Sequence, residues 1–400
     1  MSPLGLYLHV PFCTRRCDYC DFYAVVGRLG EADRFVRALA ASLRATGTSL
    51  DASERAVDTI YIGGGTPSLL TPDQTARLIG ACREAFDVAG DAEVTLEVNP
   101  EGIERSSLRG WLMAGVNRLS VGVQTLSDEG LRRRGRLHTA EQALGALRAA
   151  RDEGFGNVGA DLIAGLPDAG DEPGTGFAER FTEGIRRLLA ERPDHLSIYL
   201  FETDKNTPLM RAVAGGRERL PADDAVADAY LAALREASKA GYERYEIASF
   251  SLPGRRSRHN LKYWTGGPFL GFGPSAHSHF RGRRFAAPSD VDLFFREASR
   301  PRCDPGPSDL DYSLPDAESE AREALVLALR LAEGADLADL DRRWGTALRG
   351  VVEADLADPI AAGLVTLEGP RLRLTERGVL LANEVFLRIG VASSPCPRRP

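Results

Sequence analysis

The chain has 400 residues, of which 43% are hydrophobic and 27% are charged, and its net charge is −7. These values describe an ordinary globular protein that is longer than one hydrophobic core usually allows, so we expect more than one domain. The mild excess of acidic residues excludes a general electrostatic attraction to nucleic acid or to anionic lipid.

The first residues, MSPLGLYLHVPFC, lack the basic segment that begins a signal peptide. No apolar run approaches the roughly 18 residues of a membrane span. We therefore expect a cytoplasmic protein without stable membrane insertion. Six cysteines, three clustered and three scattered, do not form a disulfide scaffold in so long a chain, so the cluster predicts metal or redox chemistry.

Short β-branched runs alternate with longer amphipathic runs from residue 4 to about residue 202. The strand-like runs are 5–10, 57–65, 92–100, 117–124, 157–167 and 194–202. Helix patterns follow several of them, at 31–45, 71–86 and 139–154. Thr71 and Thr139 stand at N-cap positions of the last two. Strand and helix in alternation predict right-handed crossovers and a parallel sheet, either a barrel or a doubly wound sheet.

Polar and glycine-rich residues follow consecutive strands at their carboxyl ends, where such sheets place ligand loops. A cysteine cluster follows the first strand, the segment 63–68 (GGGTPS) the second, and Glu97, Gln124 and Asp161 lie on the third, fourth and fifth. Residues from so many strands converge best when the sheet curves. We therefore predict a partial (β/α)6 TIM-like barrel.

A change in composition marks the C-terminal part of the chain. We expect the barrel over 1–300, a Pro-rich linker over 301–315, a small α+β domain over 316–390 and a disordered tail over 391–400. Three helix patterns, a hairpin turning at Gly369-Pro370 and a last helix over 375–390 are typical of a winged helix. The segment 316–360 is rich in Asp and Glu, so we expect a lid or interaction surface rather than a DNA-binding domain.

Cys13, Cys17 and Cys20 lie within eight residues, and Phe22 occupies the position where a further cysteine could stand. A structural zinc site needs a fourth ligand, which only His9 on the preceding strand could supply. A disulfide would leave one thiol over. A 4Fe-4S cluster held by three thiolates, with one iron open to a small ligand, best explains why three cysteines are clustered.

The spacing CxxxCxxC resembles the cluster motif of the radical S-adenosylmethionine (radical SAM) superfamily. The resemblance implies that the methionine amino and carboxylate groups of S-adenosyl-L-methionine (SAM) chelate the open iron. It also implies SAM-binding positions in this chain, namely Tyr7, Tyr19, Gly64, Gly65, Thr66, Glu97, Gln124, Arg136 and Asp161. Singly, each of the polar strand residues could instead be a satisfied core residue.

Within the superfamily, about the first 300 residues resemble one subfamily, which holds oxygen-independent coproporphyrinogen III oxidase and the HemW group of heme chaperones. The oxidase has a further cysteine at the position of Phe22 and a long extension before the cluster. Here the cluster begins at Cys13. Both departures point to the chaperone group.

The segment 258–264, RHNLKYW, is similar to HNxxYW, the heme-binding motif of that group. The matching residues are His259, Asn260, Tyr263 and Trp264. The resemblance implies an imidazole on heme iron, and basic neighbours could pair with the propionates, namely Arg255, Arg256, Arg258 and Lys262. The alternative is a surface loop with a capping histidine. His277 and His279 are further candidates for iron or for the SAM pocket, and the sequence does not decide among the three histidines.

The predicted function is a cytoplasmic heme chaperone that holds one 4Fe-4S cluster, SAM and heme and passes heme to a membrane-bound or respiratory acceptor protein. We expect a monomer or a heme-dependent dimer that binds no nucleic acid. Two alternatives stay open. One is oxidative decarboxylation of coproporphyrinogen III, in which the cofactor performs the hard step. The other is a zinc-stabilised binding module.

Overall fold

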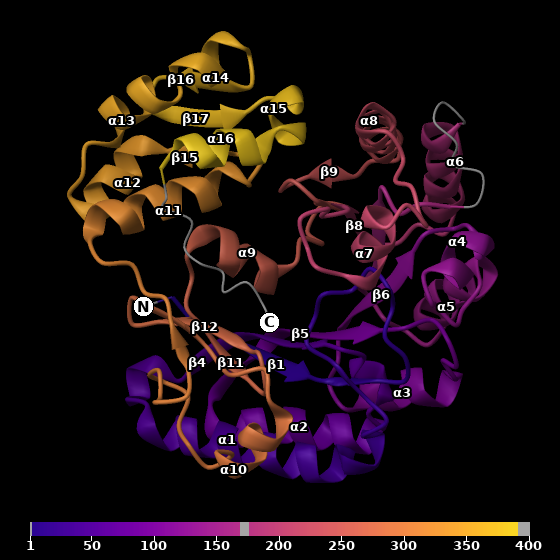
Figure 1. Cartoon of the computed structure of the whole chain (residues 1–400). Helices are drawn as coiled ribbons and strands as arrows, with labels where there is room; N and C mark the ends of the chain where they lie inside the picture. The colour runs from indigo at the N-terminus through magenta and orange to yellow at the C-terminus, as the bar shows by residue number, and fades with distance from the viewer. Residues whose placement is uncertain (1, 169–175, 391–400) are drawn as a thin grey trace.

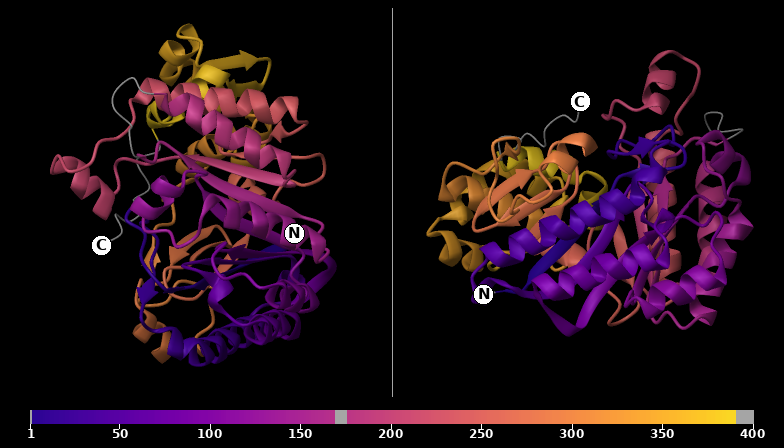
Figure 2. Two further views of the ribbon diagram at one scale, coloured as in Figure 1. Left: turned by 90° about the vertical axis from the view of Figure 1, so that its right-hand side faces the viewer. Right: turned by 90° about the horizontal axis from the view of Figure 1, so that it is seen from below.

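The computed structural model describes residues 2–168 and 176–390. A large α/β unit is built around one curved sheet, and a smaller C-terminal unit lies against one side of it, over helix α9 (Arg258–Thr265) (Figures 1 and 2). The predicted disordered tail and residues 169–175, which follow the fifth predicted strand, lie outside the described residues. No helix in the described ranges has both the length and the apolar character of a membrane span.

Six parallel strands lie side by side in chain order. They are β1 (Leu4–Val10), β4 (Ala56–Gly64), β5 (Asp87–Val98), β6 (Arg118–Gln124), β7 (Val158–Ala164) and β8 (His195–Leu200). The predicted partial barrel is thereby confirmed. β5 begins five residues before the predicted strand, because Asp87 and Val88 pair with the start of β4 ahead of a register shift.

Helices cover the outer face of these strands (Figure 1). They are α1 (Ala32–Ser49), α2 (Pro72–Ala85), α3 (Arg105–Met113), α4 (Asp128–Arg133), α5 (Ala140–Asp152), α6 (Phe177–Ala190) and α8 (Asp223–Lys239), with 3-10 turns η1 (Leu29–Glu31), η2 (Ala52–Glu54) and η3 (Pro67–Leu69). The predicted N-caps are confirmed: Thr71 accepts a hydrogen bond from the Gln74 amide, and Thr139 accepts one from the Gln142 amide.

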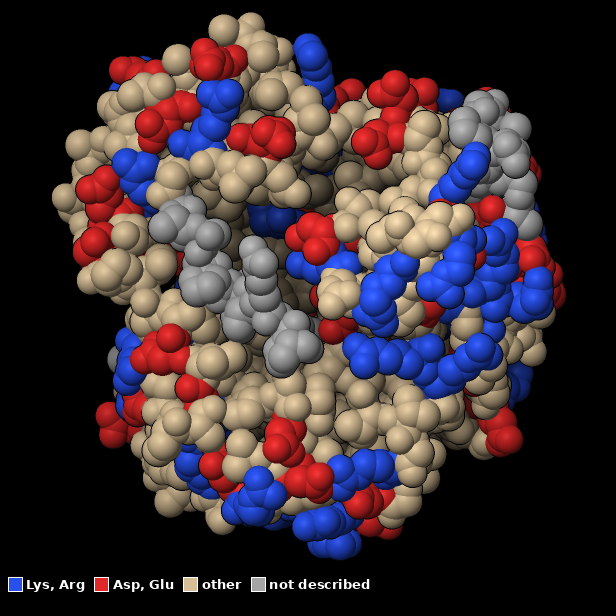
Figure 3. Space-filling model, in the orientation of Figure 1, with Lys and Arg blue, Asp and Glu red and all other residues tan. Residues whose placement is uncertain are grey.

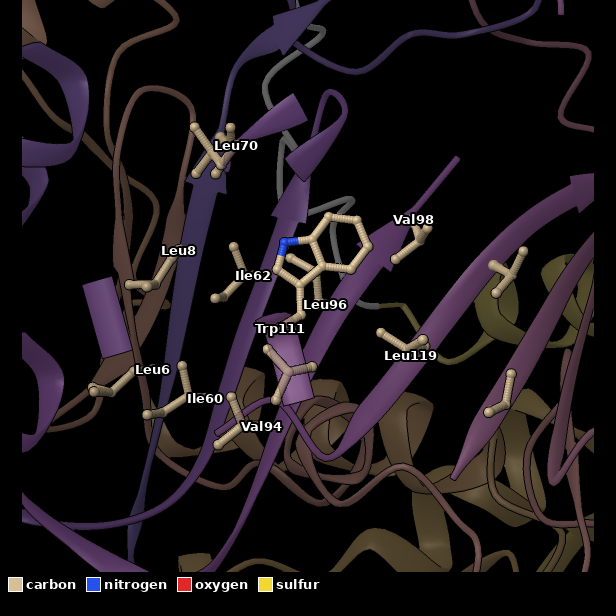
Figure 4. Close-up of a cluster of buried hydrophobic side chains, with 14 of the residues drawn as sticks. Leu6, Leu8, Ile60, Ile62, Leu70, Val94, Leu96, Val98, Trp111 and Leu119 are labelled. Carbon is tan, nitrogen blue, oxygen red and sulfur yellow. The ribbon is translucent and has the colours of Figure 1, made fainter. Parts of the chain in front are cut away.

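Side chains of the parallel strands alternate between the two faces of the sheet. Apolar residues such as Leu6, Leu8, Ile60, Ile62 and Leu96 face the helices and pack in one buried cluster with Trp111 of α3 (Figure 4). The intervening residues therefore face the interior of the barrel. On β1, β4 and β5 these are Gly5, Tyr7, His9, Thr59, Tyr61, Gly63, Glu93, Thr95 and Glu97.

Additional strands extend the sheet at both ends, so that twelve strands of the described chain form one sheet. Beside β1 these are β11 (Phe269–Phe272), β12 (His277–Phe280), β13 (Arg283–Ala286) and β14 (Leu310–Asp311); beyond β8 they are β10 (Ser249–Ser251) and β9 (Glu243–Arg244). β11 runs parallel to β1. β14 belongs to the segment interpreted as a linker and pairs with β13.

Four short elements border the barrel. A parallel pair, β2 (Phe12–Cys13) and β3 (Val25–Val26), closes the cysteine loop. Helix α7 (Pro208–Ala214) packs beside that loop, and α10 (Val291–Arg296) packs on α1.

The C-terminal unit has its own hydrophobic core. Its elements are α11 (Ala317–Leu329), β15 (Ala335–Asp336), α12 (Leu337–Trp344), α13 (Leu348–Asp355), α14 (Ala357–Ala361), β16 (Val365–Glu368), β17 (Arg371–Leu374), α15 (Glu376–Leu380) and α16 (Ala382–Arg388). The sheet has three strands rather than the two of the predicted hairpin, because β15 pairs with β17. The last predicted helix is broken at Leu381 into α15 and α16.

Candidate functional site

The three clustered cysteines lie on one loop at the mouth of the barrel. Cys13 ends β2, and Cys17 and Cys20 follow on the loop that returns to β3; all three thiols are free and half-buried. The backbone of Asp18 accepts a hydrogen bond of 2.8 Å from the Leu209 amide at the start of α7. The carboxylate of Asp18 lies 3.0 Å from the buried guanidinium of Arg134. The rest of the barrel therefore fixes the loop.

Burial disfavours negative charge on two of the three thiols. Burial raises the pKa of Cys13, and burial raises the pKa of Cys20 to about 11; for both thiols the negative charge of a Cys17 thiolate adds to the shift. The hydroxyl of Thr66 lies 3.4 Å from the Cys13 sulfur, and a guanidinium nitrogen of Arg136 lies 3.9 Å from the Cys17 sulfur. Metal coordination would convert all three cysteines to thiolates, which the Thr66 hydroxyl and the Arg136 guanidinium are placed to stabilise.

His9 cannot serve as a fourth ligand in this arrangement. Its Nε2–H donates to the Tyr23 carbonyl at 3.0 Å, so Nδ1 is the acceptor and receives the Tyr7 hydroxyl at 3.1 Å. Phe22 leaves 53% of its surface exposed beside the loop. Within the described ranges, no group of three His, Cys, Asp or Glu side chains could hold a single metal ion. A 4Fe-4S cluster binds its cysteines on separate irons, and the donor set of three thiols fits it.

The glycine-rich turn after β4 packs directly on the cysteine loop. Gly64 has a φ of +118°, and a Cβ on Gly65 would lie 2.7 Å from the Phe12 carbonyl oxygen, so both positions require glycine. The amides of Gly65 and Thr66 donate to Val10 and Phe12 at 2.8 Å each. Because these backbone N–H groups are used inside the protein, they are not available to a bound ligand.

Two carboxylates face the barrel interior, one from β5 and one from β7, on either side of β6. Glu97 accepts hydrogen bonds from the Tyr61 hydroxyl at 2.9 Å and from the Gly64 amide at 3.0 Å, and burial raises its pKa to about 7. Asp161 accepts the Ser120 hydroxyl at 2.8 Å, while its Oδ1 is buried without a partner, and burial raises its pKa. An unpartnered buried carboxylate oxygen fits a ligand with a donor group, such as the ammonium or ribose of SAM.

Arg136 and Tyr19 join the cysteine loop to the strand ends. Arg136 donates to the Asn99 side chain at 2.8 Å and to the Gly122 carbonyl at 3.0 Å, and its Nε is buried without a partner. Burial raises the pKa of Tyr19, which hydrogen-bonds to Cys17. Gln124 ends β6 with a φ of +65°. The contacts of Arg136 and Asn99 thus join the cysteine loop to the strand ends, whereas Tyr7 and Asp161 lie midway along β1 and β7.

Sequence reasoning missed three residues at this site. Asn99 bridges Arg136 and the Thr66 hydroxyl, to which it donates at 3.2 Å. Tyr61 and Ser120 hold the two carboxylates. The signal that could have found Tyr61 and Ser120 is their alternation with outward-facing apolar neighbours, and Asn99 is the next-to-last residue of the predicted strand 92–100.

The HNxxYW segment forms helix α9 rather than a loop. His259 is fully buried: its Nδ1 lies 2.8 Å from the Thr59 hydroxyl and its Nε2 lies 3.0 Å from the Tyr263 hydroxyl. Its amide donates to the Glu93 carboxylate at 3.0 Å. Burial lowers the pKa of His259 to about 3, so the ring is neutral. Both ring nitrogens are thus occupied in this conformation.

The basic neighbours of α9 already have carboxylate partners. Lys262 lies 2.7 Å from Asp58, Arg256 lies 2.7 Å from Glu333, and the others make longer contacts: Arg255 with Asp194, and Arg258 with Asp58 and Asp91. Propionate binding by these four side chains would compete with ion pairs of the protein. Asn260 is half-buried in the first turn of the helix.

His279 on β12 differs from His259 because one of its nitrogens is available. Its Nδ1–H donates to the Gly267 carbonyl at 3.3 Å, which leaves the lone pair on Nε2, and burial lowers its pKa to about 4. A backbone carbonyl on the other ring nitrogen is the usual arrangement of a metal-binding histidine. His277 lies 2.6 Å from the Tyr312 hydroxyl through Nδ1.

Residues 7–181 match the Radical SAM superfamily, and residues 316–381 match the HemN C-terminal domain. Together with the barrel and its three-cysteine loop, these matches define a radical SAM protein. The heme chaperone HemW of Mycobacterium tuberculosis is 36% identical over 390 residues, which cover 96% of this chain and 94% of that protein. HemW of Escherichia coli is 33% identical over 397 residues, which cover 97% and 99%. The chain belongs to the HemW family.

Among solved structures, coproporphyrinogen III oxidase (HemN) from Escherichia coli, a radical SAM enzyme, shares the fold. The TM-score is 0.81 at 24% identity, over 97% of this chain and 90% of that chain. Membership of the radical SAM superfamily implies a 4Fe-4S cluster and SAM as cofactors.

Proposed function

We propose that this protein is a heme chaperone that binds heme and delivers it to an acceptor protein, on a radical SAM scaffold that carries a 4Fe-4S cluster and SAM. The observation that carries the proposal is similarity over nearly the full length to curated heme chaperones from several bacteria, together with the retained HNLKYW segment on α9. The acceptor is proposed to be a membrane-bound or respiratory protein.

The cluster is assigned to Cys13, Cys17 and Cys20, and SAM to the strand-end residues described above. When bound, the cluster would supply one open iron, and SAM would chelate that iron. In this proposal Asp161 offers its unpartnered oxygen to SAM, Glu97 faces the same space, and the Gly64–Gly65 turn lets the ligand approach the backbone closely.

Heme is assigned to the surface around α9 and β12. The sequence motif assigns the iron to His259, whose nitrogens are both hydrogen-bonded inside the protein. We therefore assign the iron to His279 in the conformation described, because its Nε2 carries the lone pair and its low pKa keeps the ring neutral. Ligation by His259 would require α9 to leave Thr59 and Glu93.

Anaerobic reconstitution tests both cofactor assignments. Iron and sulfide are counted after loading, and heme is then titrated by its absorbance. We expect about four irons and four sulfides per chain. The wild type should bind heme saturably, and the H279A variant should bind it more weakly. Material without sulfide would contradict the cluster assignment, and stoichiometric zinc in a colourless protein would favour the zinc-stabilised alternative.

The rival function is oxidation of coproporphyrinogen III, and a direct assay separates it from the chaperone. The reduced, cluster-loaded protein is incubated with the porphyrinogen and SAM, and the product is analysed for protoporphyrinogen. We expect none, because Phe22 stands where the oxidase has its further cysteine. Protoporphyrinogen formed at catalytic turnover would overturn the chaperone proposal.

A further inference from the structure

Arg330 lies where the C-terminal unit meets the barrel. It follows α11 directly, and the next residues are tied to the barrel by an antiparallel bridge between Leu331 and Glu246 and by the Ala332 amide, which donates to the Tyr245 carbonyl at 3.0 Å. The guanidinium carbon of Arg330 sits 4.3 Å from the ring centroid of Trp264. An arginine of the second unit therefore stacks on the last aromatic residue of the HNxxYW segment.

The guanidinium of Arg330 has no acceptor in the described part of the protein. Its Nε is buried without a hydrogen-bond partner, its terminal nitrogens donate no hydrogen bond to a described residue, and no described carboxylate lies within 4.0 Å of it. Glu246 and Glu202 act on its charge only from a greater distance, and burial lowers the pKa of Arg330. Arg258 and Lys262, the two basic residues of α9, both have carboxylate partners, which Arg330 lacks within the described residues.

Tyr199 lies within electrostatic reach of both Arg330 and the predicted SAM residue Asp161. Tyr199 at the end of β8 is 44% exposed, yet the surrounding protein, followed by the charge of Asp161, raises its pKa, as expected of a side chain that lines a hollow. The charge of Tyr199 also acts on Arg330. Figure 3 shows a hollow between the C-terminal unit and the barrel with Lys or Arg atoms in its depth.

We propose that Arg330 binds a propionate carboxylate of the porphyrin, with Trp264 holding the guanidinium in place; this inference rests on the proposed heme function. A guanidinium presents paired N–H donors in a plane that matches a carboxylate, and stacking on an indole fixes that plane before the ligand arrives. A bound carboxylate would also compensate a positive charge that now lacks a close partner. The C-terminal unit thereby becomes part of the heme site.

Heme and its dimethyl ester, in which both propionates are esterified, distinguish this role from general stability. Each ligand is titrated, with absorbance as the readout, into four full-length proteins: the wild type and the variants R330Q, R330K and R322Q. Arg322 is the control because it lies on α11 and is bound by Glu318, Asp355 and the Ile389 carbonyl. We expect R330Q to weaken heme binding about tenfold while leaving the ester unaffected, since the lost interaction is a charge-assisted pair.

R330K, which keeps the charge but loses the planar pair of donors, should lie between the wild type and R330Q, and R322Q should match the wild type. Unchanged heme affinity in R330Q, or an equal loss for heme and for the ester, overturns the assignment of Arg330 alone. A wild type that binds no heme overturns the proposed function and this inference together.

Discussion

Replacing His259 with alanine should destabilise the protein more than it alters iron ligation. The substitution removes a fully buried ring and leaves the hydroxyls of Thr59 and Tyr263 without their partner. An orphaned buried polar group costs about 1–3 kcal/mol, and the cavity adds to it. We expect a loss of about 4 kcal/mol in the free energy of unfolding.

His279→Ala provides the matched comparison. His279 is half-buried and makes one hydrogen bond, to the Gly267 carbonyl. Its loss should cost about 1 kcal/mol. Urea unfolding of the two variants without heme measures the difference, and heme titration at low urea measures ligand affinity in the same samples.

We expect opposite orders in the two assays: H259A should be the less stable variant, and H279A should be the weaker heme binder. If H259A unfolds like the wild type and loses heme while H279A retains it, His259 is the iron ligand. The buried arrangement of α9 would then be a state that heme binding replaces.

Three further predictions concern the cluster and SAM residues. Cys17→Ala should abolish sulfide retention after reconstitution, whereas Cys82→Ala, far along α2 in the core, should retain it. The raised pKa of Glu97, about 7 against an ordinary 4.5, means that its contribution to stability is complete below pH 4.5 and is lost as pH rises through 7. Without SAM, the free energy of unfolding of the wild type should therefore fall by about 2 kcal/mol relative to that of E97Q between about pH 5 and pH 8. If the two proteins show the same dependence of this free energy on pH, the raised pKa of Glu97 is wrong. Gly65→Ala should reduce cluster content by displacing the backbone before Cys13, while Gly80→Ala, whose new Cβ meets nothing within 4 Å, should stabilise α2 by about 0.5–1 kcal/mol.

The barrel could be predicted from the sequence because its signals are local. Each parallel strand is a short β-branched run, and Thr71 and Thr139 cap their helices through contacts three residues away. The carboxyl ends of such strands meet at one edge, so the strand pattern alone was enough to place Glu97 and Asp161 together.

The arrangement around α9 could not be predicted, because it depends on contacts between distant segments. The sequence left open whether His259 binds heme iron or caps a surface loop. Instead Glu93, which is 165 residues or more away in the chain, accepts the first amides of the helix, and Asp58 neutralises Lys262. Arg330 belongs to another unit, and no local pattern connects it with Trp264.

The pairing of β1 with both β4 and β11 has a consequence for synthesis of the chain. β1 leaves the ribosome first and soon gains β4, but its other edge stays open until translation has passed Phe272. Open strand edges recruit other chains. A fragment that stops before this point would therefore tend to aggregate during expression, and insertion of the cluster into the neighbouring loop would take place on a sheet that is complete only once β11 has been made.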